Sequence, residues 1–135
     1  MTKKISTKLV DKVMYSNYLV KAVENCKQAV KALGDGAYNA AAVSAVHAAI
    51  SAADAYCVSG LSKRCSSSNH EDTAELIETT MFSNKTIVSK KFMSIIRIKN
   101  MAEYEERLVK QKEAEKAVQE AEGLLALVKK DLKEE

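Results

Sequence analysis

Two side chains that could handle the charge and the proton of a phosphate ester lie close together in the middle of the chain. Arg64 and His70 flank the stretch Cys-Ser-Ser-Ser-Asn. An arginine holds a phosphate through two parallel hydrogen bonds, and an imidazole exchanges a proton near neutral pH. The pair therefore predicts a catalytic site for phosphate chemistry, with a solvated loop and a helix-capping histidine as the alternative.

The residues around His70 also predict the start of a helix. Ser68 followed by Glu71 matches a capping box, so a helix should begin near Asn69 or His70. Backbone N–H groups at a helix N-terminus attract phosphate, and the helix dipole disfavours a charged imidazole. We therefore expect Ser68 and Asn69 to bind phosphate or RNA beside a neutral His70.

A basic stretch that leads to a tyrosine is the second candidate for binding. Arg97, Lys99 and Tyr104 follow three upstream lysines, Lys85, Lys90 and Lys91. Cations at helical spacing can line a phosphate-binding groove. We expect Arg97, Lys99 and Tyr104 to contact RNA, while an ordinary charged helix face is the alternative.

A polar stripe in an otherwise apolar segment is the third candidate. Ser44, His47, Ser51 and Asp54 recur at spacings of three, four and three residues, which places them on one helix face. This stripe is either the solvent side of the helix or a buried polar seam. In the second case His47 and Asp54 would line a site.

Other common chemistries have no motif in this sequence. We find no glycine-rich phosphate loop, no HExxH pair, no GxSxG elbow and no zinc-spaced cluster of Cys and His. The three cysteines are odd in number and lack CxxC spacing, which favours structural roles. No metal and no cofactor is expected.

The composition favours a single all-α domain over residues 1–135. The chain has no Pro, no Trp and only four Gly, while good helix formers dominate. Its net charge of +3 is compatible with nucleic acid without requiring it. No signal-peptide pattern and no apolar run long enough for a bilayer is apparent, so we expect a cytoplasmic protein without a membrane partner.

The apolar periodicity predicts five helices. The first spans about residues 3–33, with Leu9 and Val13 on its apolar face, and ends at Gly34-Asp35-Gly36. The second, over about 37–58, is apolar nearly all round and should be the central helix, with Gly60 as its stop signal.

The rest of the helical pattern is interrupted twice. A polar loop over 59–69 precedes a third helix that fades around 81–83, and the pattern from 84 onward should break between 100 and 110. Strands are essentially absent. The expected fold is a four- to five-helix up-and-down bundle.

Three segments together resemble HEPN (higher eukaryotes and prokaryotes nucleotide-binding) domains. They are residues 46–55, the Arg64 to His70 motif and the segment Lys-Asn-Met-Ala-Glu-Tyr at 99–104. The resemblance covers about residues 37–133. It implies a HEPN-like helical bundle, a homodimer, and a motif in which an Arg and a His are separated by four to six residues.

This resemblance implies a metal-independent endoribonuclease of toxin or defence type. The ribose 2′-hydroxyl would be the nucleophile, His70 the general acid or base, and Arg64 the group that orients the phosphate. Cys65 stands where active members often carry Asn, Asp or His. The alternative is a noncatalytic HEPN module that binds nucleotide, RNA or a nucleotidyltransferase partner, and a plain interaction bundle is a third.

Overall fold

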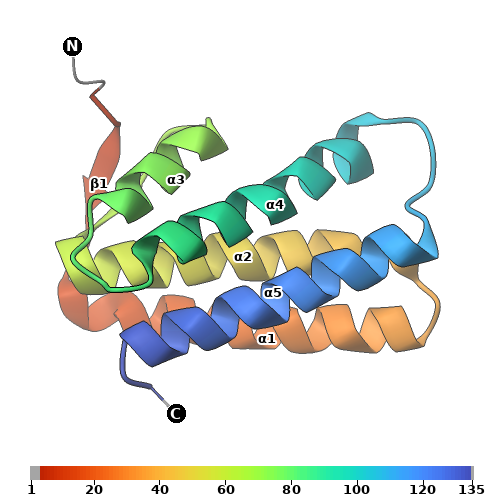
Figure 1. Cartoon of the computed structure of the whole chain (residues 1–135), viewed down its shortest axis with the longest axis horizontal. Helices are drawn as coiled ribbons and strands as arrows, with labels where there is room; N and C mark the ends of the chain where they lie inside the picture. Colours follow the sequence, from red (N-terminus) through yellow and green to blue (C-terminus); the bar gives the residue numbers. More distant parts are fainter. Residues whose placement is uncertain (1–3, 135) are drawn as a thin grey trace.

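The computed structural model describes residues 4–134 and folds most of them into helices (Figure 1). The α-helices in this range are α1 (Tyr15–Gly34), α2 (Tyr38–Leu61), α3 (His70–Glu78), α4 (Lys85–Tyr104) and α5 (Gln111–Asp131). The four long helices run alternately in opposite directions, and the short α3 lies beside the start of α4. The expected all-α bundle with five helices is confirmed.

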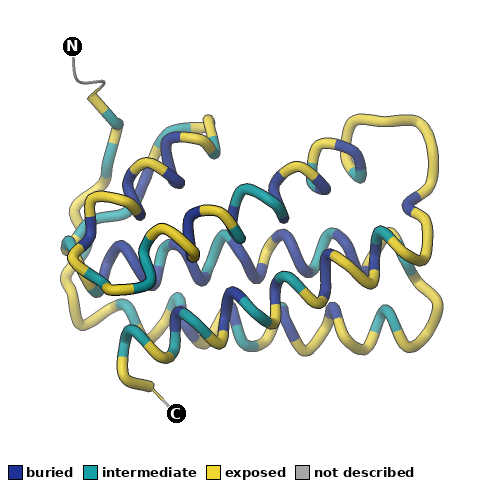
Figure 2. The backbone as a smooth tube through the Cα atoms, viewed as in Figure 1, coloured by how far each residue is buried: buried dark blue, intermediate teal, exposed yellow. Residues whose placement is uncertain are grey.

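Helix α2 is the centre of the bundle, as its composition predicts. Half of its 24 residues are buried, and most of these are alanines. It packs against α1, α4 and α5, and Figure 2 shows the buried positions of the long helices turned toward the interior. By length and hydropathy α2 would suffice to cross a bilayer, contrary to our expectation, but most of its apolar stretch is buried in the bundle. Burial of this kind is typical of the core helix of a soluble protein.

The N-terminal segment corrects two predictions. Residues 7–9 form a strand, β1 (Thr7–Leu9), and a short 3-10 helix, η1 (Lys12–Met14), precedes α1, so α1 begins well after residue 3. Strand β1 pairs antiparallel with β2 (Lys63–Cys65), and Thr7 faces Cys65 in this register. The apolar spacing was misleading because Leu9 and Val13 are 82% and 67% exposed. Strands are therefore present, as one small sheet.

The end of α2 also differs from the prediction. Gly60 does not stop the helix, which continues to Leu61 and ends at Ser62 in the left-handed conformation, with φ 55°. A Cβ on Gly60 would lie only 2.8 Å from Cε2 of Phe82. Gly60 is therefore a packing residue, because its missing side chain lets the loop after α3 approach α2.

Helix α3 begins at His70 as predicted, but its cap is different. The Oδ1 atom of Asn69 accepts a hydrogen bond from the backbone N–H of Glu71 at 3.0 Å, so Asn69 rather than Ser68 is the capping residue. The helix ends at Glu78, before the predicted 81–83. The expected break in the last helical stretch is confirmed, since residues 105–110 separate α4 from α5.

A half-buried carboxylate joins three parts of the chain at one end of the bundle. Asp131 at the end of α5 accepts hydrogen bonds from the Tyr56 hydroxyl at 2.6 Å and from the backbone and side-chain nitrogens of Asn84 at 3.2 and 2.8 Å. The ring of Tyr56 also packs on Phe82, with ring centroids 4.4 Å apart. The start of α4 is thereby fixed to both α2 and α5.

We predict that Tyr56→Phe destabilises the protein by about 1–3 kcal/mol, because the bond lost is a hydrogen bond to a charged group. The free energy of unfolding in urea is the measurement. Tyr18→Phe is the matched control, since the hydroxyl of Tyr18 makes no hydrogen bond within residues 4–134 and its loss should change stability little. Equal effects of the two substitutions would contradict this role of the Tyr56 hydroxyl.

Candidate functional site

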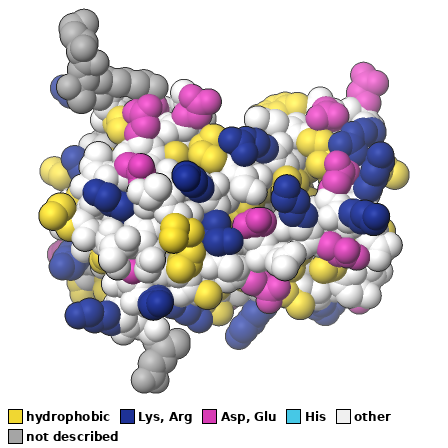
Figure 3. Space-filling view, viewed as in Figure 1, with side chains coloured by type: hydrophobic (Ala, Val, Ile, Leu, Met, Phe, Trp, Pro, Cys, Tyr) yellow, Lys and Arg dark blue, Asp and Glu magenta, His cyan; other side chains and the backbone are white. Residues whose placement is uncertain are grey.

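A pocket of about 240 Å³ lies between the start of α3 and the second half of α4. Its lining residues are Ser68, Asn69, His70, Glu71, Met93, Ile96, Lys99, Asn100 and Tyr104. Figure 3 shows the surface hollowed in the region where α4 diverges from α3. The pocket exists because α3 begins only at His70 and runs back toward the start of α4, while α4 continues to Tyr104 beyond the beginning of α3.

His70 is held at the first position of α3 by packing and by the chain before it. Its ring lies edge-on to the buried ring of Phe92, with centroids 6.4 Å apart. The α3 helix is fixed to α4 by the hydroxyl of Ser89, which donates to the carbonyl of Ala74 at 3.1 Å. Before α3, strand β2 joins β1, and the backbone N–H of Ser66 donates to the carbonyl of Ser6. The imidazole therefore has a defined position at the mouth of the pocket.

The pKa of His70 is lowered from its ordinary value. Partial burial is the main cause, the positive charge of Lys99 adds to it, and the negative charge of Glu103 opposes it. A lowered pKa keeps the imidazole neutral at pH 7, which is the form that accepts a proton. This agrees with the neutral base expected from the sequence, although burial and Lys99 are the causes found here.

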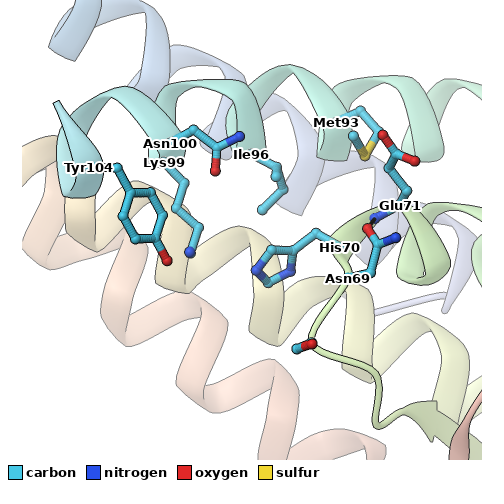
Figure 4. A pocket seen from close by; sticks show the side chains of 9 residues that line it. Asn69, His70, Glu71, Met93, Ile96, Lys99, Asn100 and Tyr104 are labelled. Atoms are coloured by element: carbon cyan, nitrogen blue, oxygen red, sulfur yellow. Dashed lines mark hydrogen bonds between the residues drawn. The ribbon is translucent and has the colours of Figure 1, made fainter.

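Lys99 brings a cation to the opposite wall of the pocket. Its Nζ lies 3.0 Å from a carboxylate oxygen of Glu103 and 5.2 Å from the ring centroid of Tyr104. The hydrogen bond to Glu103 is the largest cause of a raised pKa of Lys99, so the ammonium stays charged. Figure 4 shows the Lys99 nitrogen between the rings of His70 and Tyr104.

The structure brings together five of the residues that the sequence indicates for phosphate or RNA binding and proton transfer. They are Ser68, Asn69, His70, Lys99 and Tyr104. Arg97 is exposed on α4 and does not line this pocket. Sequence reasoning missed four lining residues, which are Glu71, Met93, Ile96 and Asn100. The last three are spaced by three and four residues on one face of α4, and this spacing could have identified them because the same face continues to Tyr104.

Arg64 lies outside the pocket. It belongs to β2, opposite Lys8, and its Nη1 donates to the carbonyl of Cys65 at 3.3 Å. Its Nε is buried and has no hydrogen-bond partner among residues 4–134. Burial raises the pKa of Asp54 on α2, and the positive charge of Arg64 offsets part of that rise.

The polar stripe of α2 is neither wholly solvent-facing nor a buried seam. His47 is exposed, whereas Ser44, Ser51 and Asp54 are half-buried. Burial raises the pKa of Asp54 to about 6, and the opposing effects of Arg64 and Lys21 are smaller. Neither His47 nor Asp54 lines the pocket around His70. Within residues 4–134, no group of three or more His, Cys, Asp or Glu side chains is arranged to hold a metal ion.

We predict that Asp54→Asn changes how stability depends on pH. The folded protein binds the Asp54 proton more tightly than the unfolded chain does, so the wild type loses stability as pH rises from 3.8 to about 6. The variant should lack this loss and be more stable at pH 7, by on the order of 2 kcal/mol. Urea unfolding across this pH range is the measurement.

The exposed Asp35 supplies the control for this experiment, because Asp35→Asn removes a carboxylate that is 63% exposed. It should leave the pH dependence unchanged. If the unfolding free energies of Asp54→Asn and the wild type changed with pH in parallel, burial of this carboxyl would not cause the loss of stability.

Comparison of the chain with protein-family models and with curated proteins gave no match.

Proposed function

We propose that the pocket around His70 binds an unpaired RNA nucleotide and that the protein is a metal-independent endoribonuclease. The observation that carries this function is the meeting of His70 from α3 with Lys99 and Tyr104 from α4 in one pocket. A neutral imidazole, an ammonium and an accessible aromatic ring are the groups needed for a proton, a phosphate and a base.

In the proposed reaction the ribose 2′-oxygen attacks the adjacent phosphorus. His70 accepts the proton of the 2′-hydroxyl as the bond from phosphorus to the 2′-oxygen forms. The bond from phosphorus to the 5′-oxygen then breaks, the leaving oxygen takes a proton from water, and the protonated His70 gives its proton to the hydroxide that remains. The products are a 2′,3′-cyclic phosphate and a 5′-hydroxyl. A neutral His70 at pH 7 supports this role.

Lys99 and Tyr104 supply binding in this scheme. Lys99 is the only Lys or Arg that lines the pocket, so it is assigned to the phosphate. Tyr104 is 73% exposed, and its free ring surface is available for a stacked base. Base stacking on a protein ring requires an unpaired base, which is why we propose single-stranded RNA as the substrate.

The resemblance to HEPN domains supports the same reaction class and a homodimer. That resemblance assigns Arg64 to the phosphate, whereas the geometry of one chain favours Lys99 for this contact. We therefore propose a positioning role for Arg64, which lies in the strand that leads to His70.

A noncatalytic binding module is the second candidate. The placement of Arg64 outside the pocket favours it. In this case the pocket would bind RNA or nucleotide through Lys99 and Tyr104 without cleaving it, alone or with a nucleotidyltransferase partner. Both candidates require the same pocket, and they differ in whether His70 transfers a proton.

We predict that the purified protein cleaves single-stranded RNA in EDTA and that His70→Gln lowers the rate by about 10²–10⁴-fold, the usual contribution of a general base. The exposed His47 provides the matched variant His47→Gln, which should retain full activity. Gel analysis of the cleavage products and their 2′,3′-cyclic ends is the measurement. Equal rates for wild type and His70→Gln would contradict the catalytic role, and binding without cleavage by the wild type would favour the second candidate.

The pH dependence of cleavage gives a separate prediction. Since His70 must be unprotonated to act as base, kcat/KM should rise with pH through the lowered pKa of His70 and be level at pH 7. The midpoint should lie below the ordinary histidine value of about 6.5. In Lys99→Gln the midpoint should move upward, because a positive charge near the imidazole is lost. A wild-type midpoint above 6.5 would contradict the lowered pKa of His70, and a rate that does not change with pH would contradict its role as base.

A further inference from the structure

The ammonium of Lys99 is already occupied in this structure. A carboxylate oxygen of Glu103 lies 3.0 Å from Nζ, and the Lys99 side chain is only 14% exposed. Glu103 is one helical turn beyond Lys99 on α4, but it is not among the residues that line the pocket. The carboxylate of Glu103 therefore lies beside the pocket and neutralises the charge of Lys99.

The other charged side chain of the lining does not compensate for this. Glu71, in the first turn of α3, is also negative, and His70 is neutral at pH 7. A phosphodiester that enters the pocket therefore meets no free positive charge while the Lys99 to Glu103 pair is closed. Two anions near one ammonium compete for it, because each gains most of its binding energy from the same charge.

Glu103 is able to leave Lys99 at low cost. Its side chain is 33% exposed, and it lies in the last turn of α4, where Tyr104 is the final helical residue. A carboxylate this exposed is solvated by water after a rotation of its side chain, without a change in the helix. The Lys99 side chain has less freedom, since it is mostly buried and its ammonium lies beside the Tyr104 ring.

We propose that Glu103 is an internal competitor for the anion position at Lys99 and sets the specificity of the pocket. A ligand binds only if its phosphate displaces the Glu103 carboxylate, so neutral ligands of similar size are rejected and weakly anionic ones bind poorly. Glu103 is a positioning residue that acts through Lys99. This inference rests on the proposed function only in its choice of RNA as the ligand, and an inorganic anion tests the same exchange.

The first experiment measures binding of a short single-stranded 2′-O-methyl oligoribonucleotide by fluorescence anisotropy. This probe lacks the 2′-hydroxyl nucleophile and stays intact. Glu103→Gln should bind it about two- to fivefold more tightly than the wild type, the effect of releasing one ion pair near a protein surface. In a Lys99→Gln background the same substitution should have no effect, because the contested charge is gone.

Glu106→Gln is the matched control. Glu106 is exposed in the adjoining loop, and its replacement changes the net charge by the same amount. A gain in affinity shared by Glu103→Gln and Glu106→Gln would overturn the proposal, since it would show a general effect of charge. An unchanged affinity of Glu103→Gln would also overturn it.

A second readout does not depend on RNA. Titration of the His70 ring protons by NMR should give a lower pKa of His70 in Glu103→Gln, because the charge of Glu103 raises that pKa, and no change in Glu106→Gln.

Inorganic phosphate should then shift the backbone signals of Lys99 and Asn100 at lower concentration in Glu103→Gln than in the wild type. If this holds while no variant binds the oligonucleotide, the inference stands and the proposed function fails. If phosphate acts equally on both proteins, the inference fails.

Discussion

The burial of α2 is the constraint on which the rest of the structure depends. A helix of 24 residues with twelve buried positions must be covered on several sides, and α1, α4 and α5 provide that cover. Its many alanines keep those neighbours close, because small side chains fill little space between helices. Most of the remaining architecture follows from this one requirement, since each long helix then needs only one apolar face.

The short length of α3 beside the longer α4 is what leaves room for a site. Near its start α4 is held by Asn84, which binds Asp131, and near its middle by the ion pair of Lys91 with Glu120 of α5 at 3.2 Å. Beyond this point the lining side chains Met93, Ile96 and Lys99 face α3 across the pocket. The side chains that could bind or react therefore lie along the second half of α4, beyond the beginning of α3.

The sequence predicts an element well where local composition decides its structure, and less well where contacts between residues far apart in the chain decide it. The apolar composition of α2 suffices to predict the central helix, and the glycines at the end of α1 suffice to predict the first turn. The pairing of Thr7 with Cys65 depends on contacts far apart in the chain, which no local period reveals, so the segment around Leu9 was assigned to a helix. Gly60 resembles a helix stop signal in the sequence for the same reason, because its role as a packing residue depends on contact with the distant Phe82.

The candidate site was predictable in part. The positions of His70 and Lys99 in one pocket follow from side-chain types and helix spacing once α3 is known to pack on α4. The separation of Arg64 from that pocket does not follow, because the strand that contains it is not visible in the sequence pattern. The ion pair of Lys99 with Glu103 can be predicted from the sequence, since Glu103 stands four residues later on the same helix.

Because the start of α4 is fixed by Asp131, a small tilt of this helix moves its far end by a larger distance. Lys99 lies fifteen residues beyond Asn84, which is about 22 Å along the axis at 1.5 Å per residue. A tilt of about three degrees about the anchored end therefore displaces the ammonium by about 1 Å. A small change in side-chain packing around Asp131 therefore changes the width of the pocket near Lys99. Core substitutions far from His70 change the distance between His70 and Lys99 in the same way.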